Sequence, residues 1–257
     1  MIHVLLSRLR QGYRTNAFPR ECPSLPERYR GRPEIRTGAC PEDCRACADV
    51  CPTEAIAFTP GPTLDLGKCL FCPACVEACP EGAITYTGDH RLAVRQREDL
   101  LVAPDRELAL AEALEARLLK LFGRSLRLRV VSAGGCNGCE VDVNVLQTAV
   151  WDIARFGIQF VASPRHADGL IVCGPVTRNM ELALRKTYDA IPEPKLVIAV
   201  GACAIQGGPY LHQEEQLGGA ATLLPVDLFI PGCPPHPLTI LDGLLRLLDR
   251  MGSPAAR

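Results

Sequence analysis

The spacing of hydrophobic residues changes along the chain and predicts two halves of different structure. Residues 126–230 hold short apolar runs separated by segments of helical length. Such alternation is typical of buried strands and helices, and it predicts a doubly wound, mostly parallel sheet. The expected strands are 126–131, 158–162, 170–173, 196–200 and 227–230, and the expected helices are 140–156, 178–190 and 237–250.

The first half shows helical periodicity in only two places. A short apolar stripe at residues 4–9 predicts an N-terminal helix, followed by an extended wrapping arm rich in arginine and proline up to residue 36. We expect this helix to dock on its own protein, and the alternative is binding to a membrane surface beside a partner. Residues 104–123 predict a second helix, which links the two halves and stops at Gly123.

Composition narrows the class of protein. The chain has 257 residues, 47% of them hydrophobic and 22% charged, and a net charge of −1, which argues against a nucleic-acid binder or a disordered chain. The N-terminus lacks the features of a signal peptide, and no apolar stretch reaches the roughly 18 residues of a membrane span. Fourteen cysteines are easiest to keep reduced in the cytoplasm. We therefore expect a cytoplasmic protein that does not span a membrane.

Eight of the cysteines form two consecutive runs, and each run ends in a Cys-Pro pair. In such a run three thiolates wrap one [4Fe-4S] cluster, whereas the fourth ligates the other cluster. The spacing therefore predicts a crossed pair of clusters. One would be held by Cys40, Cys44, Cys47 and Cys79, and the other by Cys69, Cys72, Cys75 and Cys51.

The two runs also form an internal repeat. Cysteines, prolines and apolar residues of 44–59 recur 28 residues later in 72–87, which indicates a duplicated fold. Three residues separate Cys40 from Cys44 where the second run has two, and this leaves a three-iron cluster or a shifted potential open. The alternatives to iron–sulfur chemistry are structural zinc, which favours two separated cysteine pairs, and the disulfide framework of a secreted domain.

Four further cysteines follow the carboxyl ends of predicted strands, the edge where an open parallel sheet binds ligands. Each lies beside glycine, which lets the backbone approach a cluster closely. Four thiolates at one edge predict a third cluster, and the alternative is four unrelated buried cysteines. Its ligands would be Cys136, Cys139, Cys203 and Cys233. Cys173 ends an apolar run and is expected to pack, with tuning of the cluster as the alternative, and Cys22 is expected to be a free thiol.

Several polar residues lie near this predicted edge. Glu140 follows Cys139, and a carboxylate beside a buried redox centre can take up a proton. The stronger interpretation is that the macrodipole favours an acidic residue in the first turn of a helix. His166, His212 and His236 are expected to satisfy local hydrogen bonds.

Short motifs of both halves resemble known redox subunits. Those of residues 126–250 resemble the small subunit of membrane-bound, energy-converting [NiFe] hydrogenases, a family that includes the 20 kDa subunit of complex I. They are Cys136-Asn-Gly-Cys139-Glu140, Gly174-Pro-Val-Thr177, Gly201-Ala-Cys203, Gly207-Gly-Pro-Tyr210 and Pro231-Gly-Cys-Pro-Pro235. The N-terminal part resembles the two-cluster ferredoxin subunit of the same complexes, through Arg10-Gln-Gly12, Thr15, Pro19 and Tyr29-Arg-Gly-Arg-Pro33. The chain thus looks like a fusion of both.

The resemblance implies an electron relay without a catalytic site of its own. Electrons would pass through three [4Fe-4S] clusters, the last one the proximal cluster, between a donor such as formate dehydrogenase or ferredoxin and a large subunit with a nickel–iron site. Complex I subunits have two adjacent cysteines at the first ligand position, whereas two residues separate Cys136 and Cys139, as in hydrogenase or formate hydrogenlyase. The alternatives are a complex I-like NADH/quinone oxidoreductase or nickel-free relative, and a free-standing iron–sulfur carrier.

The resemblance and the pattern together give an expected architecture and setting. We expect an α+β ferredoxin-like two-cluster domain followed by an α/β flavodoxin-like domain. The implied partners are the large subunit, other ferredoxin or dehydrogenase subunits and membrane subunits, which would hold the chain peripherally on the cytoplasmic face of the membrane. The expected boundaries are an arm at 1–36, the ferredoxin domain at 37–90, a linker with a helix at 91–124, the proximal-cluster domain at 125–250 and a tail at 251–257.

Overall fold

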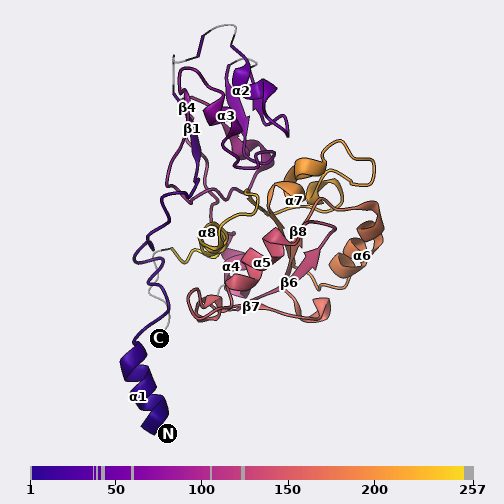
Figure 1. The fold of residues 1–257 in the computed structure, drawn as a ribbon. Helices are drawn as coiled ribbons and strands as arrows, with labels where there is room; N and C mark the ends of the chain where they lie inside the picture. Colours follow the sequence, from indigo (N-terminus) through magenta and orange to yellow (C-terminus); the bar gives the residue numbers. More distant parts are fainter. Residues whose placement is uncertain are drawn as a thin grey trace.

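The chain consists of two regions stacked on each other, with one helix projecting away from both (Figure 1). We name residues 33–102 the ferredoxin region and residues 126–247 the sheet region. The computed structural model describes residues 2–36, 38, 40–41, 44–58, 61–104, 106–122 and 125–251. Gly123, where the linker helix was expected to stop, and residues 252–257 of the expected tail lie outside the described residues.

Five parallel strands form the sheet region, and all five were predicted from the apolar runs. Their order is β10-β9-β8-β6-β7. Numbered along the chain and read from the β7 edge, this order is 2-1-3-4-5, one of the common doubly wound orders. The strands are β6 (Leu126–Ser132), β7 (Ile158–Phe160), β8 (Gly169–Cys173), β9 (Leu196–Val200) and β10 (Leu228–Ile230).

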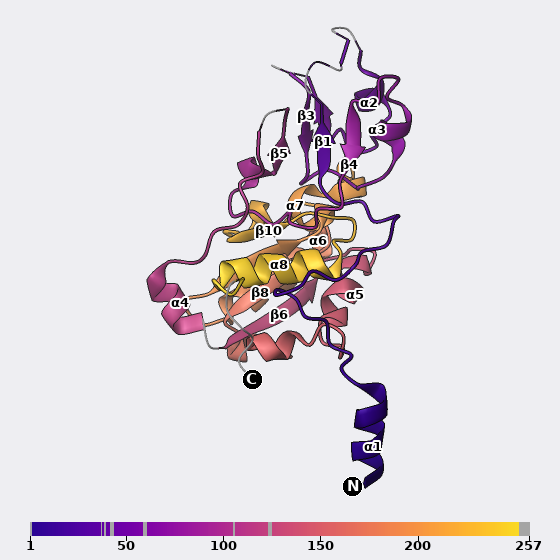
Figure 2. The same ribbon diagram turned by 90° about the vertical axis from the view of Figure 1, so that its left-hand side faces the viewer.

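Helices cover both faces of this sheet (Figures 1 and 2). Helices α5 (Gly138–Val145) and α8 (Pro237–Leu247) pack on one face, and α6 (Arg178–Asp189) and α7 (Ala202–Gln206) pack on the other. Strands β8 and β9 are therefore buried at every position. Burial on both faces explains why these strands are uninterrupted apolar runs in the sequence. Each large apolar side chain buried here stabilises the fold by about 1.5–3 kcal/mol.

The linker helix is shorter than the sequence predicts. Helix α4 covers only Ala116–Phe122, and residues 106–115 form no helix. The backbone N–H of Leu114 instead donates to the carbonyl of Leu247, and Leu114 itself is buried. The leucine spacing of this segment thus reflects how an extended chain packs against α8.

The predicted helix at 140–156 is also too long. Helix α5 ends at Val145, and Asp152 has a left-handed φ of 45°, which interrupts any helical path. A separate 3-10 turn follows. The 3-10 turns of the described chain are η1 (Arg97–Leu100), η2 (Ile153–Phe156), η3 (Pro164–His166), η4 (Gly208–Tyr210) and η5 (Ala220–Thr222).

The ferredoxin region is built from very short elements around the cysteine runs. Helices α2 (Ala46–Asp49) and α3 (Ala74–Glu77) occupy the same place in the two halves of the 28-residue repeat, so the repeat is structural as well. All strand pairs here are antiparallel. They join β1 (Pro33–Ile35) to β4 (Ile84–Tyr86), and β3 (Thr63–Asp65) to both β2 (Ile56–Ala57) and β5 (Leu101–Val102).

The arm crosses the sheet region before the chain enters the ferredoxin region (Figure 2). The N–H of Asn16 donates to the carbonyl of Val150 over 2.9 Å. The guanidinium of Arg155 donates to the carbonyls of Asn16 and Phe18, and the Phe18 ring is buried. The arm is therefore part of the core of the sheet region although it lies more than a hundred residues earlier in the chain.

Helix α1 (Ile2–Gln11) does not dock on the rest of the described chain, so the docking prediction is wrong. Every residue of α1 is exposed, including Val4 at 73% and Leu9 at 80%. An amphipathic pattern identifies the helix but does not say what covers its apolar side. No helix among the described residues has the length and hydropathy needed to cross a membrane.

Several contacts join the regions. Val94 forms an antiparallel bridge with Phe229 at the edge of β10. The guanidinium of Arg97 makes a bidentate ion pair with Asp65 of the ferredoxin region and also donates to Gln206 of α7. One apolar core continues from the ferredoxin region to one face of the sheet. The regions are thus packed on each other and not merely tethered.

Candidate metal centres

The first thiol group combines the first three cysteines of one run with the last cysteine of the other. Cys47, on α2, is buried, and burial together with the nearby thiols of Cys79 and Cys40 raises its pKa to about 11. Burial and the thiols of Cys79 and Cys44 also raise the pKa of Cys40. The longer spacing between Cys40 and Cys44 therefore does not keep Cys40 out of this group.

The second thiol group, Cys51, Cys69, Cys72 and Cys75, lines one cavity. Burial raises the pKa of Cys69 to about 12, although the N–H of Phe71 donates to its sulfur over 3.3 Å. Burial and the thiol of Cys72 raise the pKa of Cys75. The fourth cysteine of each run thus lies near cysteines of the other run.

Backbone amides donate to sulfur in the same way in both halves of the repeat. The N–H of Ala55 donates to Cys51 over 3.2 Å, and the N–H of Ala83 donates to Cys79 over 3.1 Å. Each donor lies four residues after its cysteine. Such bonds stabilise negative charge on a thiolate and on a cluster that it ligates.

The rim thiol group lies at the carboxyl edge of the parallel sheet and consists of Cys136, Cys139, Cys203 and Cys233. The first two follow β6, and the others follow β9 and β10. Burial raises the pKa of Cys139, and the next causes are the thiol of Cys203 and the carboxylate of Glu140. Burial and the thiols of Cys233 and Cys136 raise the pKa of Cys203 to about 12. The sheet therefore brings together four thiols that are far apart in the sequence.

Glycines leave room for these sulfurs. Gly201, with a φ of +93°, could not carry a Cβ, because that atom would lie 2.4 Å from the sulfur of Cys139. A Cβ on Gly208 would lie 2.7 Å from the sulfur of Cys203. The residues fit an iron–sulfur cluster: the donor set is all cysteine, the backbone approaches closely and the other groups show N–H donors to sulfur. The described residues contain no group of three or more His, Cys, Asp or Glu side chains that could hold a single metal ion.

Two further residues adjoin the rim group. Glu140 is 6% exposed in the first turn of α5, and its Oε1 has no hydrogen-bond partner. Cys173, at the end of β8, is fully buried. Burial raises its pKa, and the thiol of Cys139 and the carboxylate of Glu140 add to that rise. Cys173 therefore packs, as expected, and does so beside the rim group.

The three thiol groups adjoin one another in a row. The pKa of Cys47 is raised by burial, by thiols of its own group and, to the smallest extent, by the thiol of Cys75 in the second group. Burial raises the pKa of Cys233, followed in effect by Cys136 and then by Cys72 of the second group. Cys72 and Cys233 also line the same surface pocket, between the two regions. The second group is thus the neighbour of the rim group.

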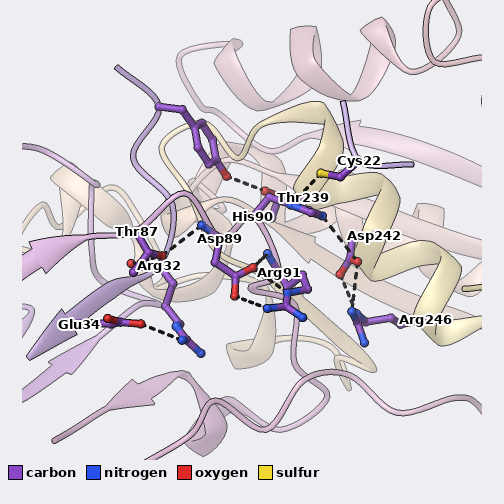
Figure 3. A network of polar contacts seen from close by, with 11 residues as sticks. Cys22, Arg32, Glu34, Thr87, Asp89, His90, Arg91, Thr239, Asp242 and Arg246 are labelled. Carbon is purple, nitrogen blue, oxygen red and sulfur yellow. Dashed lines mark hydrogen bonds and ion pairs between the residues drawn. The ribbon is translucent and has the colours of Figure 1, made fainter. Parts of the chain in front are cut away.

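Sequence reasoning missed a polar network where the arm, the end of the ferredoxin repeat and α8 meet (Figure 3). Asp242 is fully buried and accepts from Arg246, one turn later, over 2.7 Å. His90 lies between Asp242 and Cys22, 3.9 Å from each, and burial lowers its pKa. The sequence does contain a signal for this network. Asp242 is the only charged residue in the apolar run 237–245, and Arg246 follows one turn later.

Two of the other histidines, His212 and His236, make ordinary contacts, and His166 is exposed. His236 caps α8, and its Nδ1 accepts from the N–H of Leu238 over 3.1 Å. His212 lies 3.1 Å from Glu54 in the ferredoxin region, and both side chains are exposed. Cys22 is free and exposed, as expected.

Comparisons with known proteins match the sheet region and the ferredoxin region to two separate families. Residues 136–247 match the family described as NADH ubiquinone oxidoreductase, 20 Kd subunit, and residues 39–83 match the 4Fe-4S dicluster domain. The chain is 40% identical to the probable membrane-bound hydrogenase subunit mbhJ of Pyrococcus furiosus over 136 residues, which are 53% of this chain and 81% of that protein. The chain belongs to the family of the 20 kDa subunit of NADH-ubiquinone oxidoreductase.

Other members of the family lie on both the hydrogenase and the quinone side. An NADH-quinone oxidoreductase subunit of Clostridium beijerinckii is 47% identical over 117 residues, 45% of this chain and 69% of that protein. Formate hydrogenlyase subunit 7 of Escherichia coli is 41% identical over 136 residues, 53% of each chain. The chain is thus a redox subunit of an oxidoreductase, and it joins a 4Fe-4S ferredoxin domain to the family domain.

Proposed function

We propose that the chain is the electron-transfer small subunit of a membrane-bound [NiFe] hydrogenase or formate hydrogenlyase complex. It would relay electrons through three [4Fe-4S] clusters between a donor and a large-subunit catalytic site. The observation that carries the proposal is the row of three thiol groups, in which Cys72 and Cys233 line one pocket at the junction of the two regions.

Each thiol group would hold one cluster. Cys40, Cys44, Cys47 and Cys79 would ligate the first, Cys51, Cys69, Cys72 and Cys75 the second, and the rim thiol group the third. In this proposal the ferredoxin-like two-cluster domain spans 37–90 and a flavodoxin-like domain spans 125–250, with the arm and the linker at 1–36 and 91–124.

The chain's own residues would govern each electron step. A bound cluster supplies a one-electron redox couple whose potential depends on hydrogen bonds to sulfur, burial and charge. The N–H groups of Ala55 and Ala83 stabilise added negative charge in the ferredoxin region. Glu140 places a carboxylate beside the rim group and so opposes added electrons there.

The spacing at the rim favours the hydrogenase branch over quinone reduction. Two residues separate Cys136 and Cys139, which differs from the adjacent cysteines of complex I subunits. The sequence identity to this chain is similar for a hydrogenase subunit, at 40%, and for an NADH-quinone oxidoreductase subunit, at 47%. The second candidate function is therefore that of a subunit of a complex I-like or nickel-free oxidoreductase.

The exposed apolar side of α1 argues against a free-standing carrier. Leu5 at 63% and Leu9 at 80% exposure present large apolar groups that a partner would bury. Partners in this proposal are the large subunit, further ferredoxin or dehydrogenase subunits and membrane subunits. Through them the chain would lie peripherally on the cytoplasmic face of the membrane.

Anaerobic purification of the tagged chain with its partners tests the proposal. We expect about twelve irons per chain, as three four-iron clusters require, together with nickel and hydrogen evolution from a reduced viologen in the co-purifying large subunit. The same iron without nickel or hydrogen would favour the second candidate. About eight irons per chain would contradict the third cluster. A purified chain without iron and without partners would contradict the proposed electron relay.

A matched pair of variants assigns the rim ligands. Cys233→Ser removes a proposed ligand and should lower iron by about four per chain. Cys173→Ser removes a thiol that adjoins the same group but is not a proposed ligand, so about twelve irons should remain. Equal iron in both variants would contradict the assignment.

A further inference from the structure

The two halves of the ferredoxin repeat differ at one aromatic position beside the thiols. Residues 44 and 72, and 56 and 84, are equivalent in the 28-residue repeat, which makes Phe58 the counterpart of Tyr86. The two side chains are alike except for the hydroxyl. The two halves of the repeat therefore have the same aromatic position, once with a hydrogen-bond donor at Tyr86 and once without a donor at Phe58.

The Tyr86 hydroxyl lies at the wall of the cavity that the second thiol group lines. It donates to the main-chain carbonyl of Cys72 over 2.9 Å. Tyr86 also lowers the pKa of the Cys69 thiol, against the rise that burial produces. Phe71 packs near its ring, with the ring centroids 6.4 Å apart. Packing and the hydrogen bond together fix the hydroxyl in place.

The equivalent position of the first half has a different environment. The Phe58 ring carries no donor and is covered by the guanidinium of Arg45, 4.4 Å from its centroid. Arg45 is exposed, so solvent screens its charge strongly. A partly buried hydroxyl at a fixed position is screened less. The hydroxyl is therefore the larger of the two differences at this position.

We propose that Tyr86 is a positioning residue that holds the Cys72 main chain beside Cys233 and raises the reduction potential of the cluster bound by the second thiol group. A reduced cluster carries one more negative charge, and the Tyr86 O–H, whose single proton is directed at the Cys72 carbonyl, places the positive end of its dipole at the main chain of a ligand and so stabilises that charge. This effect favours an electron on the cluster next to the rim group. This inference rests on the proposed function, because it needs clusters at both sites.

Redox titration of the intact, anaerobically purified protein, followed by electron paramagnetic resonance, tests the inference. Tyr86→Phe removes only the hydroxyl and should lower the potential of one ferredoxin cluster. A change of about tenfold in its one-electron equilibrium corresponds to about 59 mV. The reverse variant, Phe58→Tyr, adds the hydroxyl at the equivalent place and should raise the potential of the other cluster only.

Iron content separates the possible outcomes. Unchanged potentials in Tyr86→Phe with full iron would overturn the inference and leave the proposed function intact. Loss of about four irons in Tyr86→Phe would also overturn it, because the hydroxyl would then be needed to hold the cluster. If both variants shift the same cluster, the assignment to the second thiol group is wrong. A wild-type protein without reducible four-iron clusters would instead contradict the proposed function itself.

Discussion

The two regions hold their thiols in opposite ways. In the ferredoxin region eight thiols come from residues 40–79, and the helices and strands described there span only two to four residues. In the sheet region the rim thiols extend from Cys136 to Cys233 and follow β6, β9 and β10, of which β9 and β10 are buried at every position. The sheet can position its ligands by its own core, whereas the short elements of the ferredoxin region depend on what the thiols bind.

Removal of iron should reveal the largest difference between the two regions. After anaerobic chelation we expect amides of 44–58 and 61–102 to exchange hydrogen almost as an unfolded chain does, while β8 and β9 keep their protection. Hydrogen exchange read by mass spectrometry measures both regions at once. Cys22→Ala, which changes an exposed thiol outside the three groups, should behave like the wild type. Equal loss of protection in both regions would show that the sheet depends on iron too.

A change at the rim should affect one cluster only. Gly201→Ala places a Cβ 2.4 Å from the sulfur of Cys139 at a left-handed φ, so we expect iron to fall from about twelve to about eight per chain. Gly88→Ala is the control, because a Cβ there meets no atom within 4 Å. Iron analysis of both purified variants measures the effect, and full iron in Gly201→Ala would mean that the loop moves freely.

Variants of the polar network beside α8 measure how much this network contributes to the free energy of unfolding. Asp242→Ala leaves Arg246 without its buried partner and should lower the free energy of unfolding by about 3 kcal/mol. The exposed pair of Glu181 and Arg185 has the same spacing on α6, and Glu181→Ala should cost about 0.5 kcal/mol or less. Urea unfolding followed by the fluorescence of Trp151, the single tryptophan, compares the two. Equal losses would contradict a structural role for the buried pair.

The smallest expected effect is a pH dependence from His90. Burial lowers its pKa in the folded protein, although the charges of Asp242 and Asp89 oppose this and those of Arg91 and Arg246 add to it. The thiol of Cys22 and the ring of Phe18 also face it. As the pH falls through about 6.5, the unfolded chain takes up a proton that the folded chain resists, so stability falls.

The matched variant isolates this contribution. Wild type should lose more stability than His90→Gln between about pH 7 and pH 5.5, because the variant has no imidazole to protonate. The same urea titration at each pH measures the difference. A parallel loss in both proteins would assign the pH dependence to other groups.

Much of the sheet region could be predicted because its signals are local. Strand β9 is an apolar run bounded by a lysine and a glycine, and its predicted and observed bounds agree at Leu196–Val200. The grouping of the rim thiols follows from strand direction alone, since parallel strands end at one edge. The crossed ferredoxin groups follow from spacing and repetition.

The failures come from residues whose partners are distant in the sequence. Leu114 has helical spacing but bonds to Leu247, and α1 is amphipathic without a partner among the described residues of this chain. The role of Tyr86 needs the position of Cys72, fourteen residues earlier. Periodicity reports that a side chain is buried or exposed, but not against which element it packs.

The arm has a consequence for the order in which the protein is made. Its residues are synthesised first, yet Asn16 bonds to Val150, and Tyr29 reaches Thr239 near the end of the described chain. The ferredoxin region leaves the ribosome before Val150 and Thr239 have been made. Its eight thiols are thus available to the cell's iron–sulfur assembly machinery while the arm is still unfastened, and the contact of Tyr29 with α8 forms last.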